Sequence, residues 1–407
     1  MKQFEIPAFY KSPIISKVKS FRKESDPRKK DFTPTLLDFG LVRFYIARHF
    51  GFCYGVENAI EISYKAISEN PGKRIFLISE MIHNPAVNAD LLDNGIRFLQ
   101  DTNGTQIIPW SELSSEDVVL IPAFGTTVAI ENTLQQIGVN IERYNTTCPF
   151  VEKVWNRSEK LGKDQHTIII HGKYNHEETR ATFSHSAQNS PALIVKDMVE
   201  AKFLGEAILG HCTAADFHHF FDGKYTANFS FENDLSKIGV VNQTTMLATE
   251  TQEITDYLRD VMIQKFGESE LKNHIADTRD TLCYATNDNQ SATYGLMEVD
   301  ADFAIVVGGH NSSNTTHLVE LLEQKFTTYF IESENELLNS NEIHSFNIHT
   351  KLTNSHTDFL SSASKVPTII LTSGASCPDA VVDRVIQRIL EFTGSERSIA
   401  DVLANLH

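Results

Sequence analysis

Three cysteines that lie far apart in the chain constrain what it can fold into. Each directly precedes a stretch with helical periodicity: Cys53 in HFGFCYGVE, Cys148 in TTCPFVE and Cys283 in LCYATN. The exposed N–H groups at the start of a helix favour bound negative charge. Three thiolates presented in this way can hold an iron–sulfur cluster and leave one iron open for a substrate. The pattern therefore predicts an enzyme in which three α/β units converge on one metal centre.

Composition limits the class of protein. A chain of 407 residues has room for two or three domains, and 41% apolar with 22% charged residues is typical of globular proteins. A net charge of −17 argues against a nucleic-acid partner. No apolar run approaches the roughly 20 residues of a membrane span. Five dispersed cysteines are not the pattern of a secreted disulfide framework, so we expect a reducing, cytoplasmic location.

Short apolar runs alternate with amphipathic stretches from about residue 42 onward. The runs predict strands at Arg43–Ala47, Ile75–Ser79, Val118–Pro122, Thr167–His171, Leu193–Lys196, Ile238–Asn242, Phe303–Val307, Tyr329–Glu332 and Thr368–Ser373. The amphipathic stretches predict helices at Glu57–Ser68, Ala86–Asn94, Ala129–Ile137, Val151–Leu161, Thr249–Lys265, Asn314–Lys325 and Ala380–Phe392. This alternation indicates an α/β fold with parallel sheets, in which ligands bind beyond the carboxyl ends of the strands.

The cysteines also suggest domain boundaries. We expect an N-terminal extension at 1–40, α/β domains at 41–147, 148–282 and 283–394, and a tail at 395–407. The strand that leads to Cys53 is assigned to the first domain, although it could pack with any of the three. The extension is rich in lysine and arginine and lacks the continuous apolar core of a signal peptide, so we expect a partly disordered surface segment. The Phe- and His-rich stretch 203–234 predicts an inserted loop or hairpin.

Polar motifs follow several of the predicted strands. His176-Glu177-Glu178 offers a carboxyl group suited to general acid catalysis, although such an exposed pair is more often a solvated turn. The loops 242–245 (NQTT), 308–314 (GGHNSSN) and 373–376 (SGAS) supply uncharged donors and close backbone approach, as a phosphate or diphosphate cradle requires. Cys377 repeats the Cys-Pro pattern of Cys148, so spacing alone leaves it open as a fourth ligand.

Taken in order, these motifs resemble the 4-hydroxy-3-methylbut-2-enyl diphosphate reductases, the IspH/LytB family of the non-mevalonate (MEP) isoprenoid pathway. The resemblance runs from about residue 43 to 390. The resemblance rests on eight motifs: GFCYGV at 51–56, IHN at 82–84, TCP at 147–149, HEE at 176–178, NQTT at 242–245, CYAT at 283–286, NSSN at 311–314 and SGAS at 373–376. Each motif is weak alone, whereas all of them in this order are highly specific.

The resemblance implies three similar α/β domains in a trefoil around a central [4Fe-4S] cluster held by Cys53, Cys148 and Cys283. The enzyme would reduce (E)-4-hydroxy-3-methylbut-2-enyl diphosphate to isopentenyl and dimethylallyl diphosphate, with electrons from a donor such as ferredoxin or flavodoxin. Glu178 matches the family's proton donor, and Thr244 matches the hydroxyl that relays hydrogen bonds to the substrate. The residues that match the diphosphate site are His83, His176, Ser312, Asn314 and Ser376, with Ser313 beside them.

Three features depart from the family pattern, one of which is that the N-terminal extension and the stretch 203–234 are not part of the common core. Phe124 stands where the family commonly has a histidine on the diphosphate, and Thr126, Thr127 or Lys173 are candidates to compensate. The loop before His176 is longer, so Glu177 remains an alternative to Glu178 as the acid. Cys377 lies outside the family's ligand set and is predicted to be a non-ligand.

Other function classes stay in view. An electron-transfer or cluster-carrier protein would use the same cysteines, with Cys377 as fourth ligand, and would have no use for the hydroxyl-rich loops. An aconitase-type hydro-lyase would also leave one iron open, but it would turn over without external electrons. A phosphate-binding module with buried cysteines would contain no iron.

Overall fold

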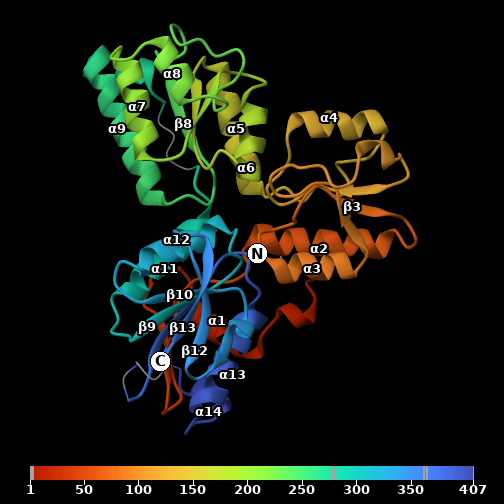
Figure 1. The fold of residues 1–407 in the computed structure, drawn as a ribbon, viewed down its shortest axis with the longest axis vertical. Helices are drawn as coiled ribbons and strands as arrows, with labels where there is room; N and C mark the ends of the chain where they lie inside the picture. Colours follow the sequence, from red (N-terminus) through yellow and green to blue (C-terminus); the bar gives the residue numbers. More distant parts are fainter. Residues whose placement is uncertain (1–3, 277–280, 361–362, 364, 407) are drawn as a thin grey trace. The chain divides into compact units, whose positions relative to one another are not determined.

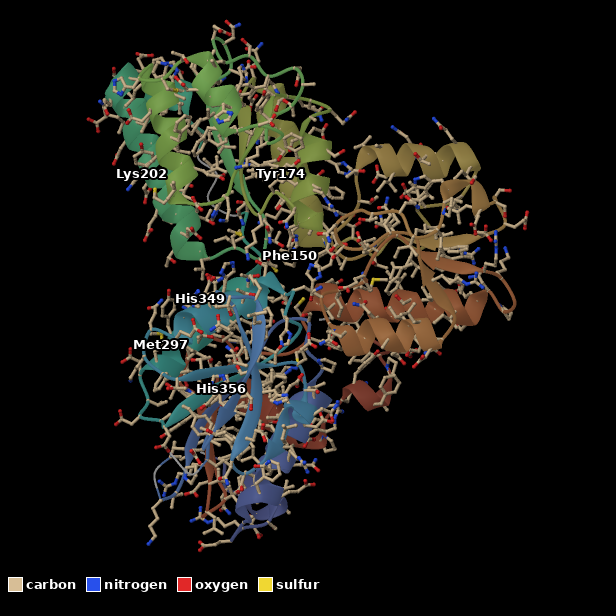
Figure 2. All side chains as sticks on the ribbon, in the orientation of Figure 1. Phe150, Tyr174, Lys202, Met297, His349 and His356 are labelled. Carbon is tan, nitrogen blue, oxygen red and sulfur yellow. The ribbon has the colours of Figure 1, made fainter. Side chains whose placement is uncertain are left out.

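A computed structural model describes residues 4–276, 281–360, 363 and 365–406. The chain divides into two compact units. The first unit comprises residues 1–57, 82–89 and 284–407, and the second comprises residues 58–81 and 90–283. Figures 1 and 2 show the ribbon and the side chains; Met297, His349 and His356 belong to the first unit, and Phe150, Tyr174 and Lys202 to the second.

The first unit is built on a five-stranded sheet in the order β1-β2-β14-β9-β10. Its strands are β1 (Thr35–Asp38), β2 (Arg43–Ile46), β14 (Thr368–Ser373), β9 (Phe303–Val307) and β10 (Thr328–Ile331). All neighbours pair in parallel except β1 with β2. Every residue of β9 is buried, as expected for a strand covered on both faces. A second, antiparallel sheet comprises β11 (Leu337–Asn339), β12 (Glu342–Asn347) and β13 (Leu352–Thr357).

The helices of this unit come from the N-terminal segment and from residue 284 onward. They are α1 (Pro13–Ser25), α11 (Tyr284–Met297), α12 (Ser313–Leu322), α13 (Asp379–Thr393) and α14 (Ile399–Ala404), with short 3-10 turns η1 (Ala8–Tyr10) and η4 (Glu334–Glu336). Buried side chains of α1 and α13 join the strand residues in one hydrophobic core. The chain ends of this unit therefore share its core with the central strands.

The second unit contains two parallel three-stranded sheets. One has the order β4-β3-β5 and the other β7-β6-β8. The strands are β3 (Ile75–Leu77), β4 (Ile96–Phe98), β5 (Val118–Leu120), β6 (Thr167–His171), β7 (Ala192–Val195) and β8 (Ile238–Asn242). The helices are α4 (Val128–Ile137), α5 (Pro149–Lys163), α6 (Glu177–Ser186), α7 (Met198–Leu209), α8 (Ala214–Phe220), α9 (Ala248–Phe266) and α10 (Leu271–His274), with 3-10 turns η2 (Trp110–Glu112) and η3 (Glu268–Glu270).

Two helices carry residues of both units. They are α2 (Tyr54–Glu69) and α3 (Pro85–Asp93). Among the described residues, no helix combines the length and apolar character needed to cross a membrane.

Three sequence-based expectations are corrected. The described part of the N-terminal extension forms α1, which buries Ile15 and Val18, and β1, which pairs with β2. The strand that leads to Cys53 is β2, and it pairs with β14 rather than with the strands of residues 41–147. Residues 203–234 hold the end of α7 and all of α8 rather than a hairpin, because Phe217 and its aromatic neighbours pack into the core of the β6 sheet.

Candidate active site

Cys53 follows β2 and lies at the start of α2. Its backbone N–H donates to the carbonyl of Ala375 at 3.2 Å, and its carbonyl accepts from Glu57. Burial raises the pKa of the Cys53 thiol, while the backbone N–H groups of Val56 and Gly55 lower it. The N–H groups at the helix start are donors that would stabilise a thiolate there once a bound metal offsets the cost of burying its charge.

The predicted diphosphate residues of the first unit gather around His83. Ser376 donates through Oγ to the carbonyl of His83 at 3.0 Å, and Asn311 Nδ2 donates to His83 Nδ1 at 3.2 Å. Because Nδ1 is the acceptor, the neutral imidazole carries its proton on Nε2, where it can donate to a ligand. Gly309 is required here, since a Cβ would lie 2.5 Å from the His83 carbonyl oxygen.

Asn314 presents a fixed hydrogen-bond donor. Its Oδ1 accepts from the backbone N–H of Ala375 at 2.9 Å, so the side-chain NH₂ is the remaining polar group. That Nδ2 is buried without a hydrogen-bond partner among the described residues. Native proteins rarely leave such a donor unsatisfied, and a ligand is one explanation. Ala375 therefore links the two residues: its carbonyl accepts from Cys53, and its N–H donates to Asn314.

The two predicted serines before Asn314 are also buried. Ser312 caps α12 by accepting from the N–H of Thr315 and also accepts from the Thr315 hydroxyl at 2.9 Å. Ser313 Oγ lies 3.4 Å from His317 Nε2. The first unit thus places Ser312, Ser313 and Asn314 after β9 and Ser376 after β14, where Asn314 contacts Ala375 and Ser376 contacts His83.

Glu178 and Thr244 meet in the second unit. Thr244 donates twice to the carboxylate, from its backbone N–H to Oε1 and from Oγ1 to Oε2 at 2.9 Å. Glu178 is 1% exposed and Thr244 is 5% exposed. Glu177, in contrast, accepts from Ser79. The pairing with Thr244 favours Glu178 over Glu177 as the proton donor.

His176 caps α6 and thereby orients Glu178. Its Nδ1 accepts from the backbone N–H of Glu178 at 3.2 Å, so a neutral ring carries its proton on Nε2. The ring of Phe124 meets the imidazole edge-on, with centroids 5.5 Å apart. The residue that replaces the family's histidine thus packs against another predicted site residue. Thr127 caps α4, which engages its hydroxyl, whereas Thr126 is buried nearby in the chain.

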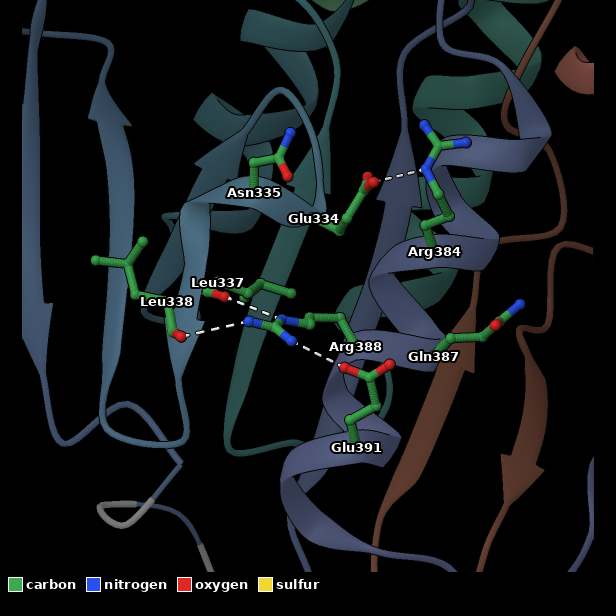
Figure 3. A pocket seen from close by; sticks show the side chains of 8 residues that line it. All are labelled: Glu334, Asn335, Leu337, Leu338, Arg384, Gln387, Arg388 and Glu391. Atoms are coloured by element: carbon green, nitrogen blue, oxygen red, sulfur yellow. Dashed lines mark hydrogen bonds and ion pairs between the residues drawn. The ribbon is translucent and has the colours of Figure 1, made fainter.

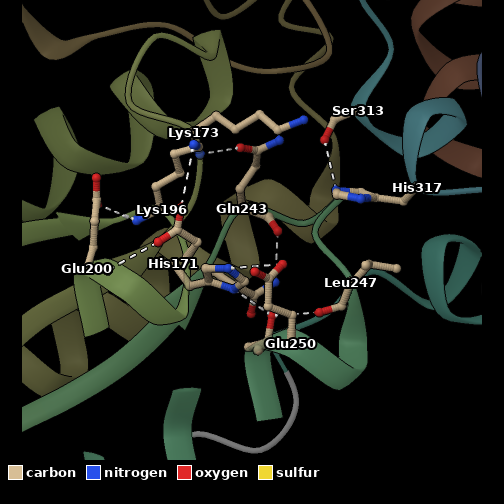
Figure 4. A network of polar contacts seen from close by, with 12 residues as sticks. His171, Lys173, Lys196, Glu200, Gln243, Leu247, Glu250, Ser313 and His317 are labelled. Carbon is tan, nitrogen blue, oxygen red and sulfur yellow. Dashed lines mark hydrogen bonds and ion pairs between the residues drawn. The ribbon is translucent and has the colours of Figure 1, made fainter. Parts of the chain in front are cut away.

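Gln243 joins the loop after β8 to the loop before α6. Its Oε1 accepts from the backbone N–H of Lys173 and from Oγ1 of Thr179, both at 3.0 Å, and its Nε2 donates to Thr245 at 2.7 Å. Figure 4 shows the contact with Lys173, and below it His171, whose Nε2 lies 3.8 Å from Glu250. The motif that contains Gln243 was recognised in the sequence, but no role was assigned to this residue.

The other two predicted ligands also lie at helix starts. Cys148 is the N-cap of α5, which has Pro149 in its first turn, and its backbone N–H donates to Ala123 at 2.9 Å. Cys283 is buried directly before α11, two residues after Thr281, whose hydroxyl donates to Asn242. Both cysteines belong to the second unit and Cys53 to the first.

The donor set fits an iron–sulfur cluster in its chemistry. No disulfide joins any of the five cysteines, and three of them precede helices. Within the described ranges, no three His, Cys, Asp or Glu side chains are close enough to form a metal site. Cys377 is fully buried in the hydrophobic core of the first unit, and burial raises the pKa of its thiol to about 12. That environment agrees with the prediction that Cys377 is not a ligand.

A separate hollow of about 540 Å³ lies between α13 and β11 (Figure 3). Its arginines are already engaged: Arg384 pairs with Glu334 at 2.7 Å, and Arg388 pairs with Glu391 at 2.9 Å while bonding the carbonyls of residues 337 and 338. None of the predicted site residues lines it. We therefore assign the function to the loops at the strand ends.

Comparisons with known proteins agree with this arrangement. The family model described as LytB protein matches residues 44–390. A 4-hydroxy-3-methylbut-2-enyl diphosphate reductase from Picosynechococcus is 40% identical over 351 residues, which cover 86% of this chain and 84% of the relative. The reductase of the same name from Microcystis aeruginosa is 39% identical over 360 residues, covering 88% and 87%.

Solved structures support the fold. The E-1-hydroxy-2-methyl-but-2-enyl-4-diphosphate reductase from Plasmodium falciparum aligns with a TM-score of 0.61 at 19% identity, covering 88% of this chain and 93% of that one. Another structure, of the reductase described as the terminal enzyme of the non-mevalonate pathway, aligns with a TM-score of 0.50 at 22% identity, covering 86% and 99%. The predicted α/β fold class is confirmed, and the chain belongs to the LytB family.

Proposed function

We propose that this protein reduces (E)-4-hydroxy-3-methylbut-2-enyl diphosphate to isopentenyl and dimethylallyl diphosphate, the last step of the non-mevalonate isoprenoid pathway. Each turnover takes up two electrons and two protons, breaks the carbon–hydroxyl bond and releases water. Family membership supports the reaction. The observation in the site that carries it is the buried Glu178 carboxylate, held by two hydrogen bonds from Thr244.

The cofactor we propose is a [4Fe-4S] cluster held by Cys53, Cys148 and Cys283. When bound, it would supply the electrons and an open iron for the substrate's hydroxyl oxygen. The positions of these three cysteines at helix starts support this ligand set. The five cysteines form no disulfide with one another, which supports a reducing, cytoplasmic location.

The chain's own residues would bind the diphosphate and move a proton. His83 and His176 would each donate from Nε2, because in both rings Nδ1 already accepts a hydrogen bond. The Asn314 amide would donate from the NH₂ group that has no protein partner among the described residues. Ser312, Ser313 and Ser376 would add hydroxyl donors.

Glu178 would hold the transferred proton on Oε2. The hydroxyl of Thr244 donates to that oxygen of the carboxylate at 2.9 Å. When Oε2 carries the proton, the bond would reverse, so that Oε2–H donates to Oγ1 and the Thr244 hydroxyl can donate to the substrate. Burial of both side chains keeps bulk water away from the proton until it is delivered.

Anaerobic purification, iron and sulfide quantitation and turnover with a viologen reductant would test this proposal. We expect about four irons per chain and substrate-dependent oxidation of the reductant. Replacement of Cys53, Cys148 or Cys283 by serine should remove the cluster, while Cys377→Ser should retain it. A colourless wild-type protein under strict anaerobic handling would exclude the cluster, and oxidation that does not depend on substrate would exclude the reaction.

A further inference from the structure

A group of exposed cations follows α1 in a chain that is acidic overall. Lys23, Arg28, Lys29 and Lys30 are exposed, and we call them the basic patch. Hydrogen bonds to Asp26 stabilise the turn that contains three of them. The carbonyl of Asp26 accepts from the N–H of Lys29, and its carboxylate accepts from the N–H of Lys30.

Buried arginines neutralise two of the acids in this segment. Arg48 lies 3.6 Å from the carboxylate of Asp26, and Arg22 lies 3.0 Å from that of Asp31. Both guanidinium groups are less than a tenth exposed. Acids near the patch include the exposed Glu24, which follows Lys23, and the half-buried Asp288. Burial raises the pKa of the Asp288 carboxyl, and the charges of Lys29 and Arg48 lower it. The patch is therefore positive on a chain whose net charge is −17.

The basic patch is connected to the Cys53 loop within the first unit. The Lys29 ammonium lies 5.9 Å from the ring centroid of Tyr284, whose hydroxyl accepts from the backbone N–H of Tyr54 at 3.4 Å. Tyr54 directly follows Cys53, and the Tyr284 side chain is 38% exposed. Few groups thus separate the patch from a proposed ligand of the redox centre.

Aromatic side chains of the N-terminal segment also cover both neighbours of Cys53. The ring of Phe4 packs on Tyr54 with centroids 4.8 Å apart, and the ring of Tyr10 packs on Phe52 at 5.7 Å. The segment that carries the cations is therefore attached to the loop that carries the ligand.

We propose that the basic patch docks a small, acidic one-electron carrier protein that reduces the centre at Cys53; this inference rests on the proposed function. Two reduced carriers would each lose one electron, and the substrate would take up both electrons with two protons and release water. Complementary charge steers such partners and raises association rates, most strongly at low ionic strength. On a chain that is strongly acidic overall, the patch offers an acidic carrier local attraction beside the Cys53 loop.

The experiment compares two reductants on the cluster-loaded full chain. One is a reduced [2Fe–2S] ferredoxin of net negative charge, and the other is methyl viologen reduced by dithionite. The test variant is Lys23→Glu/Lys29→Glu/Lys30→Glu. The control is Lys73→Glu/Lys202→Glu/Lys351→Glu, which changes the net charge equally at exposed lysines outside the patch (Lys202 is labelled in Figure 2).

We expect the test variant to lose about tenfold or more of kcat/KM for ferredoxin at low salt. Its viologen-supported rate should stay within about twofold of wild type, and the control should keep both activities. Added salt should lower the wild-type ferredoxin rate and leave the variant's rate nearly flat.

Equal ferredoxin rates in the test variant and the wild type would overturn the docking proposal. A parallel loss with both reductants would overturn it too, because the lysines would then act on the site itself. Failure of the proposed function has a different signature: wild type would not turn over with viologen, while ferredoxin binding, measured by calorimetry, would still depend on the patch.

Discussion

Replacing Gln243 with leucine tests whether hydrogen bonds behind the site set its activity. Gln243 is fully buried and joins Lys173, Thr179 and Thr245. Its neighbour Thr244 bonds Glu178, and Thr179 follows Glu178 in α6. Leucine has a similar volume but neither accepts nor donates, so the change removes these bonds with little change in packing.

The expected loss of stability follows from the groups left behind. Thr179 is fully buried, so its hydroxyl would lose its acceptor without access to water. Leaving such a group unsatisfied costs about 1–3 kcal/mol, and each further lost bond contributes about 1 kcal/mol. We therefore expect the free energy of unfolding to fall by about 2–4 kcal/mol. Because the Glu178–Thr244 pair would lose its support, kcat should fall by about tenfold to a hundredfold with little change in KM.

Urea denaturation and steady-state turnover with viologen would measure the two effects. Thr182→Val is the matched control, since Thr182 is also buried in α6 but accepts from Trp155 at 3.1 Å, away from Gln243. The control should cost about 1 kcal/mol and leave kcat unchanged. In a Glu178→Gln background, Gln243→Leu should add little further loss of kcat, because the carboxylate it positions is gone. Additive losses of kcat, or equal losses in the control, would refute the positioning role.

Further changes give distinct expectations. Glu178→Gln should keep cluster and substrate affinity but lower kcat by about 10²–10⁴, whereas Glu177→Gln should retain most activity. The opposite result in a turnover assay would identify Glu177 as the proton donor. Asn314→Leu should raise KM about tenfold or more, measured by substrate titration, because it removes the buried NH₂ donor and also the oxygen that accepts from Ala375. The Cys377 thiol has its pKa raised from 9.0 to about 12, so the folded state holds its proton longer than the unfolded state as pH rises. The contribution of this thiol to the free energy of unfolding is therefore present below pH 9 and falls by up to about 1.4 kcal/mol per pH unit above it. Urea midpoints measured between pH 8 and 10 should drop more steeply in the wild type than in Cys377→Ala.

The strands could be predicted where the sequence pattern is complete. Phe303–Val307 and Thr167–His171 are uninterrupted apolar runs, and both were predicted with the observed boundaries. A strand that is buried on both faces is apolar at nearly every position, so its own residues are enough to predict it. Pairing partners carry no such local signal, so the sequence left open which strands β2 would join, and the structure pairs it with β14.

The missed helices had capping signals that periodicity obscured. Ser12 accepts from Ile15 and is followed by Pro13, a combination typical of a helix start. Thr213 and Asp216 form a capping box at the start of α8. The first segment is rich in lysine and arginine and the second in aromatic residues. Both compositions also occur in loops, so they outweighed the capping signals.

The residue types of the candidate site were readable from the sequence, whereas the bonds that hold them together were not. Polar loops at the carboxyl ends of parallel strands meet at one edge, so motifs after β9 and β14 were expected to lie together. Ala375, however, connects Cys53 to Asn314 entirely through its backbone carbonyl and N–H. Any residue type except proline can make both bonds, so the sequence contains no mark of them. The geometry at Ala375 thus depends on the fold that places β2 beside β14, and that pairing is what positions Cys53 next to the loop that bonds Asn314.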